Sequence, residues 1–327
     1  MANRNQPAND DVFHVRINER RKIEFSHERH ISIEDLSVKL PKNDSLLCEL
    51  HKLGKKDIKI LQYLSKKDIK YPTPVEFHIS ELTHVTNNEN REKILESEGF
   101  KAHGDEYKFS WWSLKIDEKS ITEAEERYLE MKFKNRTQEQ IDRQESFLSK
   151  FTTSPAFHIK KSRYGNFRFT FPLTELMETY KNQMCGGQDP VLREYKTMFY
   201  SQEIMYVVLV HSPVDNAKFE KFPVIESNPF VEYRNDTIIW GAQAISDNLA
   251  FQLQLNKEKK LAEIEPVSGH IYYVWDHVSL AFHFNEVLQF SKERLTKSLT
   301  PCEQDNINLS GSNPLTFEEA KKICDDL

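Results

Sequence analysis

The sequence predicts an α+β protein with a well-filled core. Candidate strands and helices alternate through the first two thirds of the chain and mostly strands follow, which is the element order of the α+β class. The run Ile204–His211 is apolar and rich in β-branched residues, which is typical of a central strand covered on both faces. Apolar residues make up 38% and aromatic residues 11% of the 327 residues, and this composition excludes wholesale disorder. The length suggests about two domains, or one domain with a large appendage.

Residues 1–74 predict a polar N-terminus followed by a helical extension. Asn, Asp, Gln and Arg dominate the stretch up to about residue 20, so we expect it to be frayed. Apolar residues recur at three- and four-residue steps from Leu46 to Leu64, which indicates two short helices joined at Gly54. Lysines surround these helices, and a solvated helix face is favoured over a phosphate-binding face.

A central domain is expected over residues 75–218. Pro72 and Pro74 disfavour helix in the residues before them and mark its entry. Ser120 followed by Glu123 has the pattern of a capping box, so a helix is expected to begin there. Residues 134–146 either continue this helix or form a loop. The expected elements are strand 75–85, helix 88–97, strand 100–116, the helix from Ser120, strand 157–171, helix 172–180 and strand 204–211.

The remaining residues are expected to form a β-rich appendage over 219–299, and a linker with a short acidic helix over 300–327. Trp240 and Trp275 are expected to pack this appendage against the central domain. The short strands are expected near 230–233, 237–240, 250–255 and 271–284.

The charge balance and the N-terminal sequence limit the binding partners and the cellular compartment that we expect. The chain has 45 basic and 51 acidic residues and a formal charge of −6, so it lacks a general electrostatic footprint for nucleic acid or an anionic membrane. The polar N-terminus does not resemble a secretory signal, and no stretch approaches the length of an apolar membrane span. We therefore expect an intracellular protein, cytoplasmic rather than nuclear, with its four scattered cysteines reduced.

Several common sites are absent from the sequence. No Gly-rich phosphate loop occurs, which argues against P-loop, Rossmann and kinase functions. His27 and His30 have a ligand-like spacing, but no nearby Cys pair or carboxylate completes a site, so no metal is expected.

Two segments contain residues that could bind a ligand or take part in catalysis. In the first, His84 and Thr86 lie two residues apart at a strand end, hence on one side, and an Asn-rich helix start follows. In the second, Glu203 stands immediately before the apolar strand that starts at Ile204.

These segments resemble the first and last signatures of the ADP-ribosyltransferase superfamily, in its PARP-like, diphtheria-toxin-like branch. The resemblance covers about residues 76–212 and includes the helix that ends on Gly99-Phe100. It implies a split β-sheet that holds NAD, with His84 hydrogen-bonded to the adenosine-side ribose and Thr86 in contact with the nicotinamide carboxamide. Glu203 would be the catalytic residue, since a fixed carboxylate stabilises the ribosyl cation that develops as nicotinamide leaves.

Two positions depart from that family. Val85 stands where the family usually has Gly, which leaves the space for the nicotinamide in question. The Tyr that stacks on nicotinamide has no clean match, and Tyr107, Trp111 and Trp112 are the candidates. Trp111 and Trp112 point to opposite faces of any strand, so at least one is expected in the core.

The implied partners are NAD and a protein acceptor that the sequence does not identify. The strand that ends near His84 and the strand that begins near Ile204 are expected to lie close in one sheet, with both side chains facing one cleft. Two alternatives stay open. One is a catalytically inactive module that binds a nucleotide or a protein segment in the same cleft. The other is an interaction protein in which His84 and Glu203 never meet, with His84 part of a capped helix start and Glu203 a solvent-facing residue.

Overall fold

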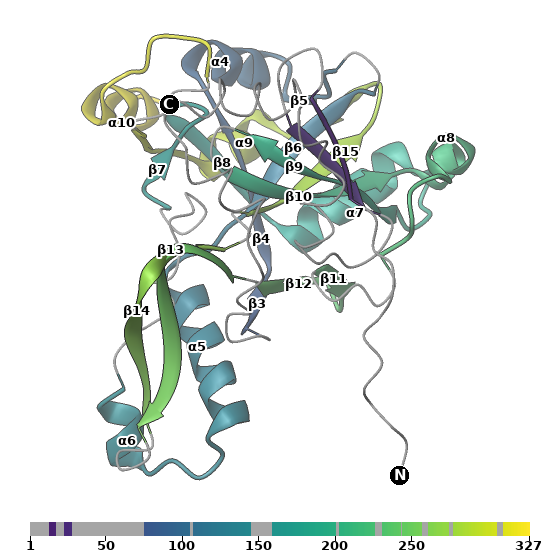
Figure 1. Cartoon of the computed structure of the whole chain (residues 1–327). Helices are drawn as coiled ribbons and strands as arrows, with labels where there is room; N and C mark the ends of the chain where they lie inside the picture. The colour runs from purple at the N-terminus through teal and green to yellow at the C-terminus, as the bar shows by residue number, and fades with distance from the viewer. Residues whose placement is uncertain are drawn as a thin grey trace.

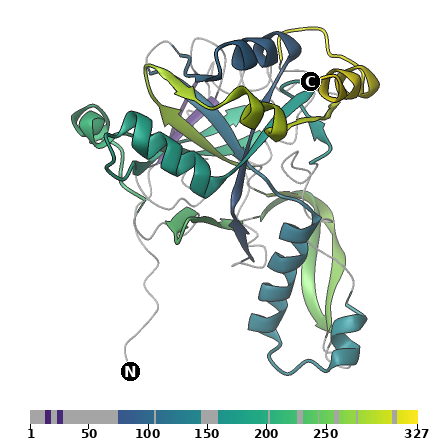
Figure 2. The same ribbon diagram turned by 180° about the vertical axis from the view of Figure 1, so that it is seen from behind.

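The computed structural model describes residues 13–17, 23–27, 75–104, 107–144, 159–200, 203–225, 231–242, 244–256, 261–274, 277–305 and 310–327. It has a body built on one large sheet and an arm that extends below the body, at the lower left in Figure 1 and at the lower right in Figure 2. The mixture of helices and several sheets confirms the α+β class. The two helices expected between Leu46 and Leu64, and Trp275, lie outside the described residues.

Nine strands form the main sheet. All its neighbouring pairs are antiparallel except β10 and β15, which run parallel. Their order across the sheet is β1 (Phe13–Ile17), β2 (Ile23–His27), β9 (Val191–Tyr200), β10 (Glu203–His211), β15 (His277–His283), β6 (Phe109–Leu114), β4 (Glu81–Thr86), β8 (Phe167–Pro172) and β17 (Leu299–Pro301).

The centre of this sheet is covered on both faces. Val208 and Val210 of β10 belong to the main core, while Val207 and Leu209 pack with Phe219 on the opposite face. All four of these valines and leucines are fully buried. The prediction of a central, doubly covered strand from the apolar run is therefore confirmed.

Two parts of the sheet differ from the expectation. The stretch up to about residue 20 was expected to be frayed, yet residues 13–17 form β1, which pairs with β2 at the sheet edge. The alternation of Phe13, Val15 and Ile17 with polar residues is a strand pattern that the polar composition concealed. Residues 277–283, expected in a separate appendage, form β15 between β10 and β6.

Seven α-helices surround the sheets in the described part of the chain. They are α4 (Asn88–Glu96), α5 (Glu118–Lys132), α6 (Gln138–Asp142), α7 (Leu173–Met184), α8 (Asn216–Phe219), α9 (Lys292–Ser298) and α10 (Phe317–Asp325). The helix expected to begin at Ser120 begins at Glu118, because the Asp117 carboxylate accepts the Ser120 amide proton at 2.9 Å and takes the cap. No described helix is long and apolar enough to cross a membrane.

Smaller sheets complete the body and the arm. β3 (Val75–Ile79) pairs with β12 (Thr237–Ala242), which pairs with β11 (Val231–Arg234). Phe77 stacks on Trp240 with ring centroids 5.1 Å apart, which confirms that Trp240 packs onto the central region. The arm consists of α5, α6 and the hairpin of β13 (Ala244–Asn256) and β14 (Leu261–Val274) (Figure 1). The remaining pairs are β5 (Gly99–Lys101) with β16 (Val287–Gln289), and β7 (Lys161–Ser162) with β18 (Glu303–Gln304).

Candidate functional site

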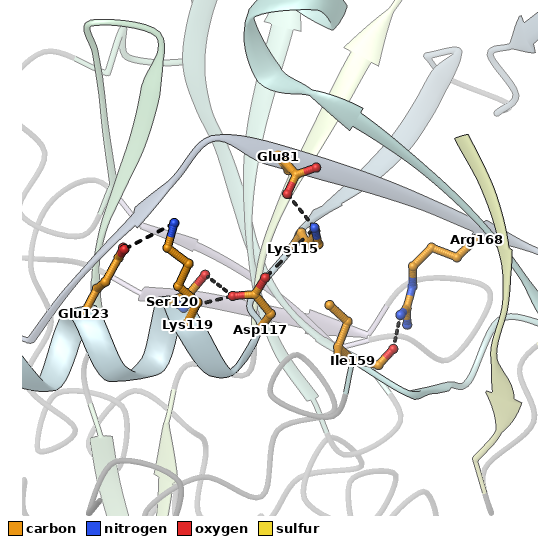
Figure 3. A network of polar contacts seen from close by, with 8 residues as sticks. All are labelled: Glu81, Lys115, Asp117, Lys119, Ser120, Glu123, Ile159 and Arg168. Carbon is orange, nitrogen blue, oxygen red and sulfur yellow. Dashed lines mark hydrogen bonds and ion pairs between the residues drawn. The ribbon is translucent and has the colours of Figure 1, made fainter. Parts of the chain in front are cut away.

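β4 and β6 are joined at one end and separate at the other. Their ladder has two pairs, Leu82 with Leu114 and Thr83 with Ser113. Just beyond it, Lys115 donates its backbone amide proton to the Glu81 carbonyl at 3.1 Å, and its ammonium pairs with the Glu81 carboxylate at 2.5 Å (Figure 3). After Thr83, β4 pairs only with β8. We call the place where residues 84–86 leave residues 109–112 the β4–β6 split.

The joined end of β4 and β6 is also where the arm begins, because α5 follows β6 there. The Asp117 carboxylate lies 4.0 Å from the Lys115 ammonium and accepts from both the amide and the hydroxyl of Ser120 at 2.9 Å. The end of β6 is thus tied both to β4 and to the start of α5, as Figure 3 shows. The split is therefore a local feature of the other end of the strands.

His84 lies in the β4–β6 split. Its Nδ1 donates to the carbonyl oxygen of Trp111 at 2.8 Å, and its half-buried ring packs near Phe100 and Trp112, with centroids 5.1 and 5.4 Å away. Burial lowers the pKa of His84 from 6.5 to about 4, so the imidazole is neutral at neutral pH. Because Nδ1 carries the proton, Nε2 is an acceptor, and no described residue donates to it.

The backbone of Thr86 lies against the loop that contains Gly165. Thr86 is buried at the end of β4, and a Cβ at Gly165 would lie 2.2 Å from its carbonyl oxygen. Gly165 has φ +138°, a conformation that suits glycine, and its turn covers Thr86. Asn87 then caps α4 by accepting from the Asn90 amide at 2.9 Å. The Asn-rich segment is therefore a helix cap, and Thr86 is packed under a turn.

The candidate aromatic residues separate into two groups on opposite faces. Trp112 is 1% exposed and packs in the main core, which confirms that one of the adjacent tryptophans is a core residue, whereas Trp111 is 38% exposed. Trp111 contacts Phe109 edge-on at 5.7 Å, and Phe109 lies 6.0 Å from Tyr107. Tyr107 therefore belongs to the Trp111 face, while the His84 ring lies with Trp112.

Tyr107 is surrounded by cations and aromatic rings. The ammonium groups of Lys218 and Lys221 lie 5.4 and 5.6 Å from its ring centroid. Phe219 and Tyr195 lie 5.2 and 6.4 Å away. Tyr107 is thus packed against the segment after β10, at a distance from His84 along the sheet.

Glu203 is the first residue of β10, opposite Tyr200 of β9. β15 and β6 lie between β10 and β4. The pairs Thr83–Ser113, Ser113–Ser279 and Ser279–Val207 form one row across the sheet, so His84 is level with Val208, five residues beyond Glu203. A strand spacing of about 4.8 Å and a rise of about 3.3 Å per residue place the two Cα atoms about 20 Å apart. The sheet contains both residues and does not bring them together.

Two histidines that the sequence analysis did not select are deeply buried. His211 ends β10 and His283 ends β15, and both are at most 1% exposed. Their signal in the sequence is a polar residue at the end of an apolar strand, which many strands share.

No group of three or more described His, Cys, Asp or Glu residues is arranged to hold a metal ion. The side chains of His27 and His30 are outside the described part of the chain. Comparisons with protein-family models, curated proteins and solved structures find no match.

Proposed function

We propose that this chain is an ADP-ribosyltransferase-like module that binds NAD, or another ADP-ribosyl compound, at the β4–β6 split. The observation that carries the proposal is the neutral His84, held by the Trp111 carbonyl at 2.8 Å with Nε2 left as an acceptor. A ribose hydroxyl is a donor that such a nitrogen accepts. The order of the two sequence motifs supports the same ligand class.

Trp111 contributes its backbone carbonyl to this site, because that carbonyl fixes the His84 ring. Its indole is 38% exposed, but it lies with Phe109 and Tyr107 on the face of the sheet opposite the His84 ring. We therefore assign neither Trp111 nor Tyr107 as the stacking residue for a ligand bound at His84.

Binding without transfer is favoured by the register of the sheet. Glu203 begins β10, which is separated from β4 by the two strands β15 and β6, and it lies five residues below the level of His84. The Cα atoms of the two residues are about 20 Å apart, so only a ligand extended across β6 and β15 could contact both. The proposal is therefore of a binding module, catalytically inactive at Glu203.

Transfer of ADP-ribose from NAD to a protein acceptor is the second candidate. The His84-Val85-Thr86 and Glu203-before-strand motifs, in this order, favour it. It requires that Glu203 act on the nicotinamide ribose, and loss of turnover in Glu203→Gln is its signature.

Calorimetric titration of the full chain with NAD and with ADP-ribose tests the proposal. We expect binding by the wild type and a loss of at least about tenfold in affinity for His84→Ala, as removal of one ligand hydrogen bond of this kind costs about 1.4 kcal/mol. His78→Ala is the matched control, because His78 lies on β3 in a different sheet and its ring bonds to the Glu76 carboxylate at 3.2 Å. If neither compound binds at millimolar concentration, the proposal fails and the interaction-protein hypothesis replaces it.

A further inference from the structure

His211 and His283 flank one buried phenylalanine. The centroids of both imidazole rings lie 4.9 Å from the centroid of Phe219, which is fully buried. The two histidines come from the ends of the parallel neighbours β10 and β15, and Phe219 comes from α8. Two strand ends and the segment that follows β10 thus share one small core.

Both imidazoles have the same hydrogen-bond pattern. The Nδ1 of His211 donates to the Ser212 carbonyl, and that of His283 donates to the Lys108 carbonyl, each at 2.8 Å. Since a carbonyl accepts only, Nδ1 carries the proton in both rings and Nε2 is an acceptor. The guanidinium Nε of Arg193 donates to His211 Nε2 at 2.9 Å. The ammonium of Lys218 donates to His283 Nε2 at 3.0 Å.

The two cations connect the sheet to residues 212–222, which we call the 212–222 segment. Arg193 also donates through Nη1 to the Phe222 carbonyl at 2.7 Å and through Nη2 to Asn216 Oδ1 at 3.2 Å. Lys218 belongs to the segment itself and also lies over the Tyr107 ring. Two neutral imidazoles therefore orient the groups that hold this segment on the sheet.

Protonation of either imidazole is incompatible with this arrangement. An imidazolium has two donors and no acceptor, so its Nε2 would face a second cation about 3 Å away. Burial, together with the nearby cations, lowers the pKa of both His211 and His283 below 6.5. The Asp215 carboxylate, 3.9 Å from His283 Nε2, acts in the opposite direction.

Two other titratable side chains near the histidines, Tyr180 and Cys185, keep their protons in this pH range. Burial raises the pKa values of Tyr180 and Cys185, so both remain protonated at and below neutral pH. The described charged and titratable groups near the two histidines include Lys108, Tyr180, Cys185, Arg193, Asp215 and Lys218, and His283 also lies close enough to His211 to act on its charge.

We propose that His211 and His283 form a pH-sensitive latch that holds the 212–222 segment on the sheet at neutral pH and releases it on acidification. Protonation expels Arg193 and Lys218 from the two Nε2 atoms, and Asp215 becomes the partner of the charged His283. Release withdraws Phe219 and the lysines from Tyr107, and so uncovers the aromatic surface of Tyr107 and Phe109.

Hydrogen exchange of the full chain, with rates normalised for the intrinsic effect of pH, tests this latch. On a change from pH 7.5 to pH 5.5 we expect at least about tenfold loss of protection in peptides from the 212–222 segment, since each proton taken up on opening changes the opening equilibrium tenfold per pH unit. The internal reference is α5, which contains neither histidine and is expected to keep its protection. Unchanged protection of the 212–222 segment overturns the proposal, as does an equal loss in α5.

Substitution separates the two imidazoles from other acid effects. Glutamine offers a neutral acceptor near the position of Nε2 and does not titrate, so His211→Gln and His283→Gln should each reduce the acid response of the segment. His78→Gln is the control and should respond as the wild type does. A full wild-type response in both latch variants overturns the proposal. If these variants do not fold, the pKa values of His211 and His283 are measured in the wild type from the NMR signals of their imidazole nitrogens. A pKa at or above 6.5 for both residues overturns the proposal.

Discussion

The imidazole Nδ1 of His84 donates to the backbone carbonyl of Trp111 across 2.8 Å, at a point where their strands no longer pair. The His84 side chain thus replaces the backbone amide that would donate to this strand carbonyl if the two strands were paired. This bond fixes the proton on Nδ1 and leaves Nε2 as a hydrogen-bond acceptor. The same bond explains how β4 and β6 can separate without leaving that carbonyl unsatisfied.

Replacement of Trp112 by alanine should destabilise the fold far more than replacement of its neighbour. Trp112 is 1% exposed and packs against Phe100 at 4.8 Å and Phe171 at 5.8 Å, so Trp112→Ala should cost about 3–5 kcal/mol in the free energy of unfolding. Trp111→Ala should cost less than about 1 kcal/mol, because that ring is 38% exposed. Urea unfolding of both variants checks this, and equal losses would contradict the assignment of faces.

Gly165→Ala tests the turn that covers Thr86. The added Cβ would lie 2.2 Å from the Thr86 carbonyl oxygen, and φ is +138°, so we expect more than about 2 kcal/mol of destabilisation. Gly186→Ala is the matched control: its φ is +58°, and its added Cβ has nothing within 4 Å. It should therefore cost only about 1 kcal/mol. Thermal or urea unfolding measures both, and a mild effect at Gly165 would mean that the turn is placed incorrectly.

The titration of His84 predicts a specific loss of stability in acid. Its pKa is lowered to about 4 in the fold, against 6.5 in the unfolded chain, so the unfolded state binds the proton first. The contribution is fully present above pH 6.5 and is lost as the pH falls towards 4, with a slope of at most about 1.4 kcal/mol per pH unit. Solvent contact of the half-buried ring reduces this slope. Urea unfolding between pH 7.5 and pH 5 should show a shallower pH dependence for His84→Gln than for the wild type or His78→Gln.

The sequence was sufficient to predict the central strand, because a run of apolar residues can be buried on both faces in only a few ways. β10 and the cores of β4 and β6 follow from such local patterns. The order of the strands in the sheet does not follow from local patterns. Alternation of apolar and polar residues identifies β15 as a strand, yet nothing in the local sequence indicates that it lies between β10 and β6. The start of α5 depended on a choice between Asp117 and Ser120, two capping residues within one turn, which only the side-chain geometry decides.

The candidate site was predictable to a similar degree. His84 could be selected because a histidine at a strand end before a helix cap is a short-range pattern. The separation of His84 from Glu203 depends on the register of four strands, and the covering of Thr86 depends on Gly165, which is distant in sequence. His211 and His283 share Phe219 only because β10 and β15 are parallel neighbours. Long-range pairing therefore decides which polar residues meet.

Glu203→Gln distinguishes binding from transfer. The substitution keeps the size and a hydrogen-bonding group while it removes the charge. Glu203 begins β10, which is separated from β4 by the two strands β15 and β6. If the chain is a binding module, NAD affinity in calorimetry should change by less than about twofold, since the register puts Glu203 about 20 Å from His84. Neither the wild type nor the variant should then release nicotinamide from labelled NAD.

If the chain is a transferase at Glu203, the wild type should release nicotinamide, and the variant should lose about a hundredfold or more in turnover while it retains affinity. Glu194→Gln, a nearby acid on β9 with no role in either hypothesis, is the control and should match the wild type in both measurements.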